Sequence, residues 1–179
     1  MLPLDPVFAI ILRWALGAVF LTAAVHKLSG FSIFRATLSE YRLLPGAIEG
    51  FGAAAIVALE FVAGVGMFIS AFAPLAVPIV MFLLVFYMLA IGINLARGRR
   101  DIDCGCSGPA MRQTLSGWLL ARNGVLLAAA ALCLLPATSR QLIWLDSLTI
   151  IFGAGVFLLL YTSVNLLIAN GPRLRALFN

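Results

Sequence analysis

Long apolar segments, separated by short polar or basic stretches, form the hydrophobic pattern of this chain. Five such segments cover residues 7–25, 50–72, 74–95, 115–135 and 148–168. About 20 helical residues cross the ~30 Å hydrocarbon core of a bilayer, so each segment is long enough to span a membrane. The segments are continuous rather than alternating, which favours helices over barrel strands. The pattern therefore predicts an all-α integral membrane protein, with residues 1–179 forming a single multi-pass domain.

The connection between the first two segments has a pattern of its own. Phe31, Phe34, Leu38 and Tyr41 recur at steps of three and four, with polar and charged residues largely between them. This spacing predicts a short amphipathic helix lying at the membrane interface. One interpretation is an ordinary connector, and the other is a lid or a surface through which a quinone enters.

The composition agrees with lipid as the surrounding solvent. Hydrophobic residues make up 63% of the chain and charged residues only 11%, whereas soluble domains carry about 25% charged residues. The net charge of +5 does not indicate nucleic acid as a partner, because the basic residues lie at the ends of the apolar segments. In that position they report how the chain threads through the bilayer.

Lysine and arginine are distributed unevenly between the two sides of the predicted bundle. The loops after the first and third segments and the C-terminal tail share one side and carry nine of them, against Arg140 alone on the other. The positive-inside rule then predicts an N-terminus outside and a C-terminus in the cytoplasm of a bacterial inner membrane. The nine are Lys27, Arg35, Arg42, Arg97, Arg99, Arg100, Arg112, Arg173 and Arg175.

The stretch DIDCGCSGP, residues 101–109, is the part of the chain most typical of chemistry. Cys104 and Cys106 place two sulfur atoms in one short loop, and the glycine between them permits a tight backbone. One interpretation is thiol–disulfide exchange with a thioredoxin-like partner, because a disulfide across so small a ring is strained and exchanges readily. A second is a soft-metal site, but only Cys133 and His26 remain as further nitrogen or sulfur ligands, and we predict no metal. The third is a pair of small residues in a tight turn.

The predicted orientation bears on this choice. It places the loop on the cytoplasmic face, where dithiols are kept reduced, which disfavours a purely structural disulfide. Cys133 lies about 20 residues further on, near the far end of the fourth segment, and is predicted to be an inert thiol.

Charged side chains inside the predicted spans are the other candidates for function. Arg13, Glu60 and Arg122 are costly in hydrocarbon and normally face a partner in the bundle interior. Glu60 lies near the middle of its segment, where either arginine is within reach, so one prediction is a structural ion pair. The alternative is a polar pocket, extended by Asn123, that handles protons or binds a quinone head group. Lys27, at the end of the first segment, is predicted to anchor at the lipid head groups.

Five pieces of the sequence together resemble the MauE branch of the DoxX-like membrane proteins: RWALGAVFLTAAVHKL, FRATLSEYRLLP, ALEFVAGVGM, DCGCSG and WLLARNGVLL. They cover roughly residues 10–135, and the DCGC and ARN pieces are the most specific. The resemblance implies an antiparallel four-helix transmembrane bundle, here followed by a fifth C-terminal span. The resemblance also implies that Cys104 and Cys106 are a redox pair and that Arg13, Glu60 and Arg122 form a polar membrane core, to which we add Asn123 beside Arg122.

The resemblance further implies a redox-associated function. The namesake of the family is linked to maturation of the methylamine dehydrogenase small subunit, a disulfide-rich periplasmic protein, together with a thioredoxin-like partner. This chain would then be a membrane thiol–disulfide redox protein, and the alternatives are a non-enzymatic assembly factor, a soft-metal-binding protein and a small transporter. The client is periplasmic whereas the charge count places the cysteine loop in the cytoplasm, so either electrons cross the membrane or the orientation is reversed.

Overall fold

The computed structural model describes the backbone of residues 4–105, 113–138 and 140–176, and side chains as far as Asn170. Within these ranges the chain is helical, and its only β pairing is two isolated bridges, Leu4 with Ala137 and Asp103 with Thr114. The expected all-α architecture is therefore confirmed. Its elements are α1 (Pro6–Ser29), α2 (Phe31–Glu40), the 3-10 turn η1 (Gly46–Ile48), α3 (Glu49–Phe68), α4 (Ala73–Ala96), α5 (Gly117–Leu132) and α6 (Trp144–Ala176).

Within the described part of the chain, four helices are long and apolar enough to cross a membrane: α1, α3 together with η1, α4, and the Trp144–Asn170 part of α6. The fourth predicted span differs, because α5 has only 16 residues. At 1.5 Å per residue it is about 24 Å long, which is shorter than the ~30 Å hydrocarbon core. Extended backbone at Ser116 precedes α5, and Pro136 follows its end.

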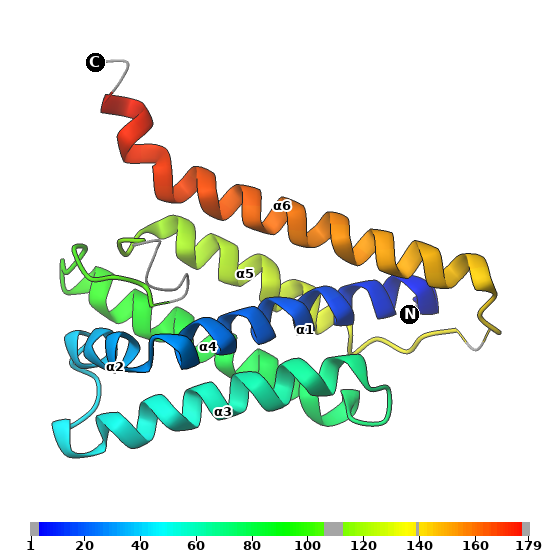
Figure 1. Ribbon diagram of the computed structural model, residues 1–179, viewed down its shortest axis with the longest axis horizontal. Helices are drawn as coiled ribbons and strands as arrows, with labels where there is room; N and C mark the ends of the chain where they lie inside the picture. The colour runs from blue at the N-terminus through cyan, green and yellow to red at the C-terminus, as the bar shows by residue number, and fades with distance from the viewer. Residues whose placement is uncertain (1–3, 106–112, 139, 177–179) are drawn as a thin grey trace.

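The helices form an elongated bundle with two distinct ends (Figure 1). One end carries α2, the loop between α4 and α5, and the C-terminal end of α6. The other end carries the N-terminus, the turn between α3 and α4, and the chain that leads into α6. The segments predicted to share a side of the membrane therefore lie at the same end of the bundle.

Close packing of α1 against α3 sets the register of the bundle. A Cβ atom on Gly17 would lie 3.0 Å from the carbonyl oxygen of Gly64, and one on Gly64 would lie 3.0 Å from the backbone nitrogen of Leu21. Small residues let membrane helices approach this closely. The two helices therefore cross at Gly17 and Gly64 and run in opposite directions. Residues before the crossing in α1 lie beside residues after it in α3, and the reverse holds on the other side of the crossing.

The predicted amphipathic helix is present as α2, directly after α1. Its apolar side chains Phe34 and Leu38, and Tyr41 at its C-terminal cap, are buried, while Arg35 and Glu40 are exposed. The buried face packs against α3. This places α2 as a cover over one end of the bundle, beside the cysteine loop.

Candidate functional site

A buried cluster of Lys27, Glu60 and Tyr87 joins α1, α3 and α4. The Lys27 ammonium group forms an ion pair with Glu60 Oε1, and the Tyr87 hydroxyl donates a hydrogen bond to the same oxygen at 2.6 Å. Only 5% of Lys27 and 1% of Glu60 are exposed. The Lys27 ammonium group also lies 5.1 Å from the ring centre of Phe34 and 4.9 Å from that of Tyr87, as in a cation–π contact.

The prediction that Lys27 is a membrane anchor is wrong, and the geometry of α1 explains why. The helix continues to Ser29 rather than ending near Val25. Lys27 follows buried Leu16 by eleven residues, which at about 100° per residue brings it to within about 20° of the same face. It therefore points into the bundle, along the stripe that also buries Phe20.

The ion partner of Glu60 is Lys27, rather than either arginine that was expected. Arg13 lies one turn before Gly17 in α1, and Glu60 lies one turn before Gly64 in α3. Because the helices run in opposite directions at that crossing, these two residues lie about 12 Å apart along the axes. The Arg13 guanidinium instead donates to the carbonyl of Met67, at 3.3 and 3.2 Å. There it covers the C-terminal end of α3, where a cation is favoured by the helix dipole.

Arg122 and Asn123 form a second polar group, joined to α6. The Arg122 guanidinium donates to Asn165 Oδ1 at 2.9 Å and to Asn123 Oδ1 at 3.3 and 3.4 Å. The Gln113 side chain donates to the Asn165 carbonyl at 3.0 Å, so this group also ties the end of the cysteine loop to α6. Tyr161 lies beneath the guanidinium, 6.0 Å from ring centre to Arg122 Cζ.

The two polar groups meet at one small cavity, which we call the polar cavity. Lys27, Glu60, Tyr87, Arg122 and Asn123 line it, together with apolar side chains of α1, α4 and α5. About 30 Å³ of it can hold the centre of a water molecule, more than the ~10–15 Å³ that one water needs. Within the described ranges, two buried side-chain atoms of the residues that line it have no hydrogen-bond partner, Glu60 Oε2 and Asn123 Nδ2. The expected polar core thus brings Glu60, Arg122 and Asn123 together but leaves Arg13 outside.

Cys104 is held rigidly at the end of the bundle that carries α2. Its backbone N–H donates to the Gln113 carbonyl at 2.8 Å, and the Leu115 N–H donates to the Ile102 carbonyl at 3.1 Å. These bonds form a short antiparallel ladder around the loop. The Tyr41 hydroxyl donates to the Cys104 carbonyl at 3.3 Å. Burial, and secondarily the nearby Asp103 carboxylate, raises the pKa of Tyr41, so the phenol stays protonated as a donor.

Gly105 gives the cysteine loop its sharp bend. Its φ of +70° lies in the left-handed region, which L side chains rarely adopt. Its N–H donates to Asp103 Oδ1 at 3.1 Å, an Asx-type turn. A Cβ atom on Gly105 would approach Thr37 Cγ2 of α2 to 3.2 Å, so the backbone of the loop packs directly against α2.

The structure describes two of the three cysteines, Cys104 and Cys133. Cys104 is 8% exposed and is not a free thiol. Cys106 lies outside the described residues, as does Arg112. Cys133 is a free, half-buried thiol at the C-terminal cap of α5, and α5 ends away from α2 (Figure 1). Among the described residues, no three His, Cys, Asp or Glu side chains gather in a way that could hold a metal ion.

Cys104 also lines a narrow groove, which we call the cysteine groove. Its walls come from α2, α3, α4 and the chain after α2, and they include Phe34, Leu38, Leu43, Leu44, Tyr87 and Cys104. The groove leaves about 500 Å³ of open space, its mouth included, of which about 40 Å³ can hold the centre of a water molecule. Tyr87 lines both this groove and the polar cavity, so it forms part of the wall between them.

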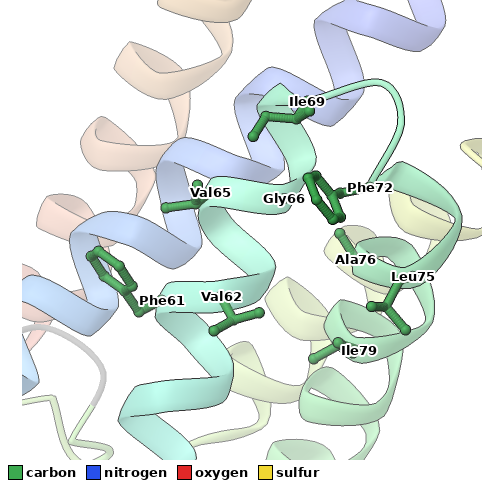
Figure 2. A pocket seen from close by; sticks show the side chains of 9 residues that line it. All are labelled: Phe61, Val62, Val65, Gly66, Ile69, Phe72, Leu75, Ala76 and Ile79. Carbon is green, nitrogen blue, oxygen red and sulfur yellow. The ribbon is translucent and has the colours of Figure 1, made fainter.

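Two further grooves lie on the outside of the bundle. Figure 2 shows the one near the α3–α4 turn, lined only by apolar side chains and Gly66 and here called the turn groove. The other runs between α5 and α6. Its lining is apolar apart from the guanidinium of Arg122 and the polar atoms of the Trp118 and Tyr161 side chains. Apolar surfaces of this kind are expected where helices face lipid.

Three members of the site were missed from the sequence: Lys27 as an ion partner, Tyr87 and Asn165. The position of Lys27 on the Leu16 face was a usable signal. Tyr87 and Asn165 are polar residues in long apolar segments, and in the bundle interior such residues are a recognised sign of hydrogen bonding between helices.

The fold and the site define a small multi-pass membrane protein with a buried acid–lysine–tyrosine cluster and a cysteine loop at one end. The family model described as Methylamine utilisation protein MauE matches residues 5–136. The chain therefore belongs to the MauE family, which confirms the resemblance seen in the sequence.

Named relatives match along most of the chain. The methylamine utilization protein MauE of Paracoccus versutus is 38% identical over 165 residues, covering 91% of this chain and 88% of that protein. The protein of the same name from Paracoccus denitrificans is 33% identical over 170 residues, covering 92% and 89%. That of Methylorubrum extorquens is 36% identical over 134 residues, covering 74% and 72%. No solved structure matches the chain.

Proposed function

We propose that the chain is a membrane thiol–disulfide redox protein of methylamine utilisation, in which Cys104 and Cys106 cycle between dithiol and disulfide. The observation that carries this proposal is the placement of Cys104. It is pinned by the Gln113 backbone and by Tyr41, and it lines a groove whose wall Tyr87 shares with a buried Lys–Glu pair. The shared name of the relatives supports methylamine utilisation as the setting.

The burial of Cys104 suggests a division of roles within the pair. Exchange begins when a thiolate attacks one sulfur of a disulfide, and it needs access to that sulfur. Since Cys104 is 8% exposed, we assign the encounter with a thioredoxin-like partner to Cys106 and the resolving step to Cys104. Through such a partner the protein would support maturation of the disulfide-rich methylamine dehydrogenase small subunit.

Trapping of mixed disulfides in native membranes tests this proposal. Cys104→Ser should accumulate a mixed disulfide between Cys106 and the partner, because the resolving thiol is missing. Cys106→Ser should accumulate none, and Cys133→Ser serves as the matched control that behaves like the wild type. If both cysteines of the loop stay open to alkylation under oxidising and reducing conditions alike, or if the double serine variant matures the client normally, the proposal fails.

The orientation in the membrane is part of the same proposal: N-terminus outside, cysteine loop and C-terminus in the cytoplasm. With Lys27 engaged in an ion pair, the nine positive residues on the cysteine side become eight, still against Arg140 alone. Single cysteines in a cysteine-free background test it. Ala47→Cys, at the α2 end, should react with an impermeant thiol reagent only from the cytoplasm, and Ala71→Cys, in the α3–α4 turn, only from outside. The reverse labelling would invert the orientation.

A further inference from the structure

Oxidation of a dithiol releases two electrons and two protons, so the proposed cycle needs an acceptor of both. The cysteine groove is where Cys104 meets open space within the bundle. Its lining is almost wholly apolar, and only the Tyr41 and Tyr87 hydroxyls and the cysteine add polar atoms. A charged redox carrier would lose its hydration there without finding a counter-charge on the walls.

The shape of the groove narrows the class of acceptor further. The part of the groove that can hold the centre of a water molecule is small, about 40 Å³. A flat ring needs the least room of the groups that can carry two electrons and two protons, and Leu43 and Leu44 at the walls of the groove are only partly buried. Flat, uncharged, lipid-soluble molecules that take up two electrons and two protons are quinones.

Glu60, a carboxylate that can accept a proton, lies directly behind Tyr87 in the wall of the groove. The Tyr87 hydroxyl donates to Glu60 Oε1 at 2.6 Å, and Glu60 also lines the polar cavity. The second carboxylate oxygen, Oε2, has no hydrogen-bond partner among the described residues, so it can accept a proton. Tyr87 can pass a proton between the two spaces without water entering the groove.

We propose that the cysteine groove binds the head ring of a quinone, which oxidises the Cys104–Cys106 dithiol. Both S–H bonds break and an S–S bond forms, while the two quinone carbonyls become hydroxyls. The two electrons and two protons lost by the thiols equal those gained by the quinone, with Glu60 and Tyr87 holding a proton in transit. This inference rests on the proposed function and names its electron acceptor.

Anaerobic oxidation of the purified protein in detergent tests the inference. The protein is reduced with dithiothreitol, freed of the reagent and mixed with a short-chain benzoquinone. Quinone absorbance and free thiols are then followed together. One quinone should be consumed for each disulfide formed. Leu43→Trp, which fills the cysteine groove, should slow this step by about tenfold or more. Ile79→Trp, which fills the turn groove of Figure 2, should leave it unchanged.

Tyr87→Phe separates a role in proton transfer from a structural one. It should slow quinone reduction and change the pH profile of that step, whereas a purely structural role would slow the step without moving the profile. If the oxidised protein fails to exchange even with reduced thioredoxin, the proposed function itself is wrong. If it exchanges with thioredoxin but its dithiol does not react with the quinone, or if both tryptophan variants slow the quinone step equally, only the present inference is overturned.

Discussion

Lys27 of α1 and Glu60 of α3 form an ion pair inside the bundle, although the two residues are 33 positions apart in the chain. Both side chains are almost fully buried, and Tyr87 completes the cluster from α4. In hydrocarbon, neither charge has water to stabilise it. The pair therefore requires α1, α3 and α4 to keep their relative positions.

Removing one member of this pair should destabilise the protein more than removing both. Glu60→Gln or Lys27→Met leaves an uncompensated buried group, and we expect each to lower the free energy of unfolding by about 3 kcal/mol. The double variant should regain much of that loss, because no charge is then left unpaired. The measurement is an unfolding titration in mixed detergent micelles.

Exposed Glu40 provides the matched control for the variants that remove one charge of the Lys27–Glu60 pair. Glu40→Gln removes a carboxylate from the surface of α2, and surface charges contribute about 0–1 kcal/mol. The ion pair would be energetically unimportant if the Glu60 and Glu40 variants unfolded at the same detergent concentration.

The crossing of α1 and α3 leads to a second prediction, on glycine. Gly17→Ala and Gly64→Ala should each cost about 1–3 kcal/mol, because the new methyl group would meet backbone atoms about 3.0 Å away. Backbone cannot move aside as a flexible side chain can. The same unfolding titration measures the loss.

Gly92 of α4 is the matched control for the crossing. A Cβ atom there meets nothing within 4 Å, so Gly92→Ala should be neutral or stabilising by ~0.5–1 kcal/mol. Equal effects at Gly17 and Gly92 would mean that helix propensity, rather than close approach, explains the result.

Much of the architecture could be predicted from the sequence, because lipid imposes a simple rule on it. Long apolar segments in a bilayer must be helical, and the spacing of Phe34, Leu38 and Tyr41 was enough to predict the short helix α2. The Cys-Gly-Cys stretch was equally visible, since cysteine is scarce elsewhere in the chain. These inferences depend only on local composition and spacing.

The partners in the site could not be predicted, because they depend on how one helix slides along another. A shift of about 12 Å, or roughly two turns, between α1 and α3 would bring Arg13 level with Glu60 in place of Lys27. The contact of Gly17 with Gly64 fixes that shift, yet every apolar segment contains at least one glycine. Identifying this pair of glycines requires the packed structure.

The N-terminal end of the bundle carries a pH-dependent contact. A hydrogen bond from Arg140, followed by one from the Val7 N–H, lowers the pKa of Asp5 below 3.8. The contact between Asp5 and Arg140 therefore contributes its full stability above the ordinary pKa of an aspartate. That stability is lost as the pH falls through the lowered pKa of Asp5. Arg140→Gln should move the Asp5 titration midpoint up towards 3.8, measured by NMR on the labelled carboxyl carbon. Arg97→Gln, at the opposite end, should leave the midpoint in place, and a shift with that variant would contradict a local cause.

Gly105 leads to the prediction closest to the proposed chemistry. Gly105→Ala places a methyl group at a left-handed position and within 3.2 Å of Thr37, so the loop must either shift or strain. Gly98 is also left-handed, with a φ of +74°, but a Cβ atom there meets open space. Each variant should lower the free energy of unfolding by about 1–2 kcal/mol, because an L residue is strained in the left-handed region. Only Gly105→Ala should also push Cys104 away from α2. We therefore expect Gly105→Ala to slow thiol exchange in the mixed-disulfide assay and Gly98→Ala to leave it near the wild-type rate. Equal slowing by both variants would mean that backbone strain causes the effect. No slowing by either would mean that the packing of the cysteine loop against α2 does not matter for thiol exchange.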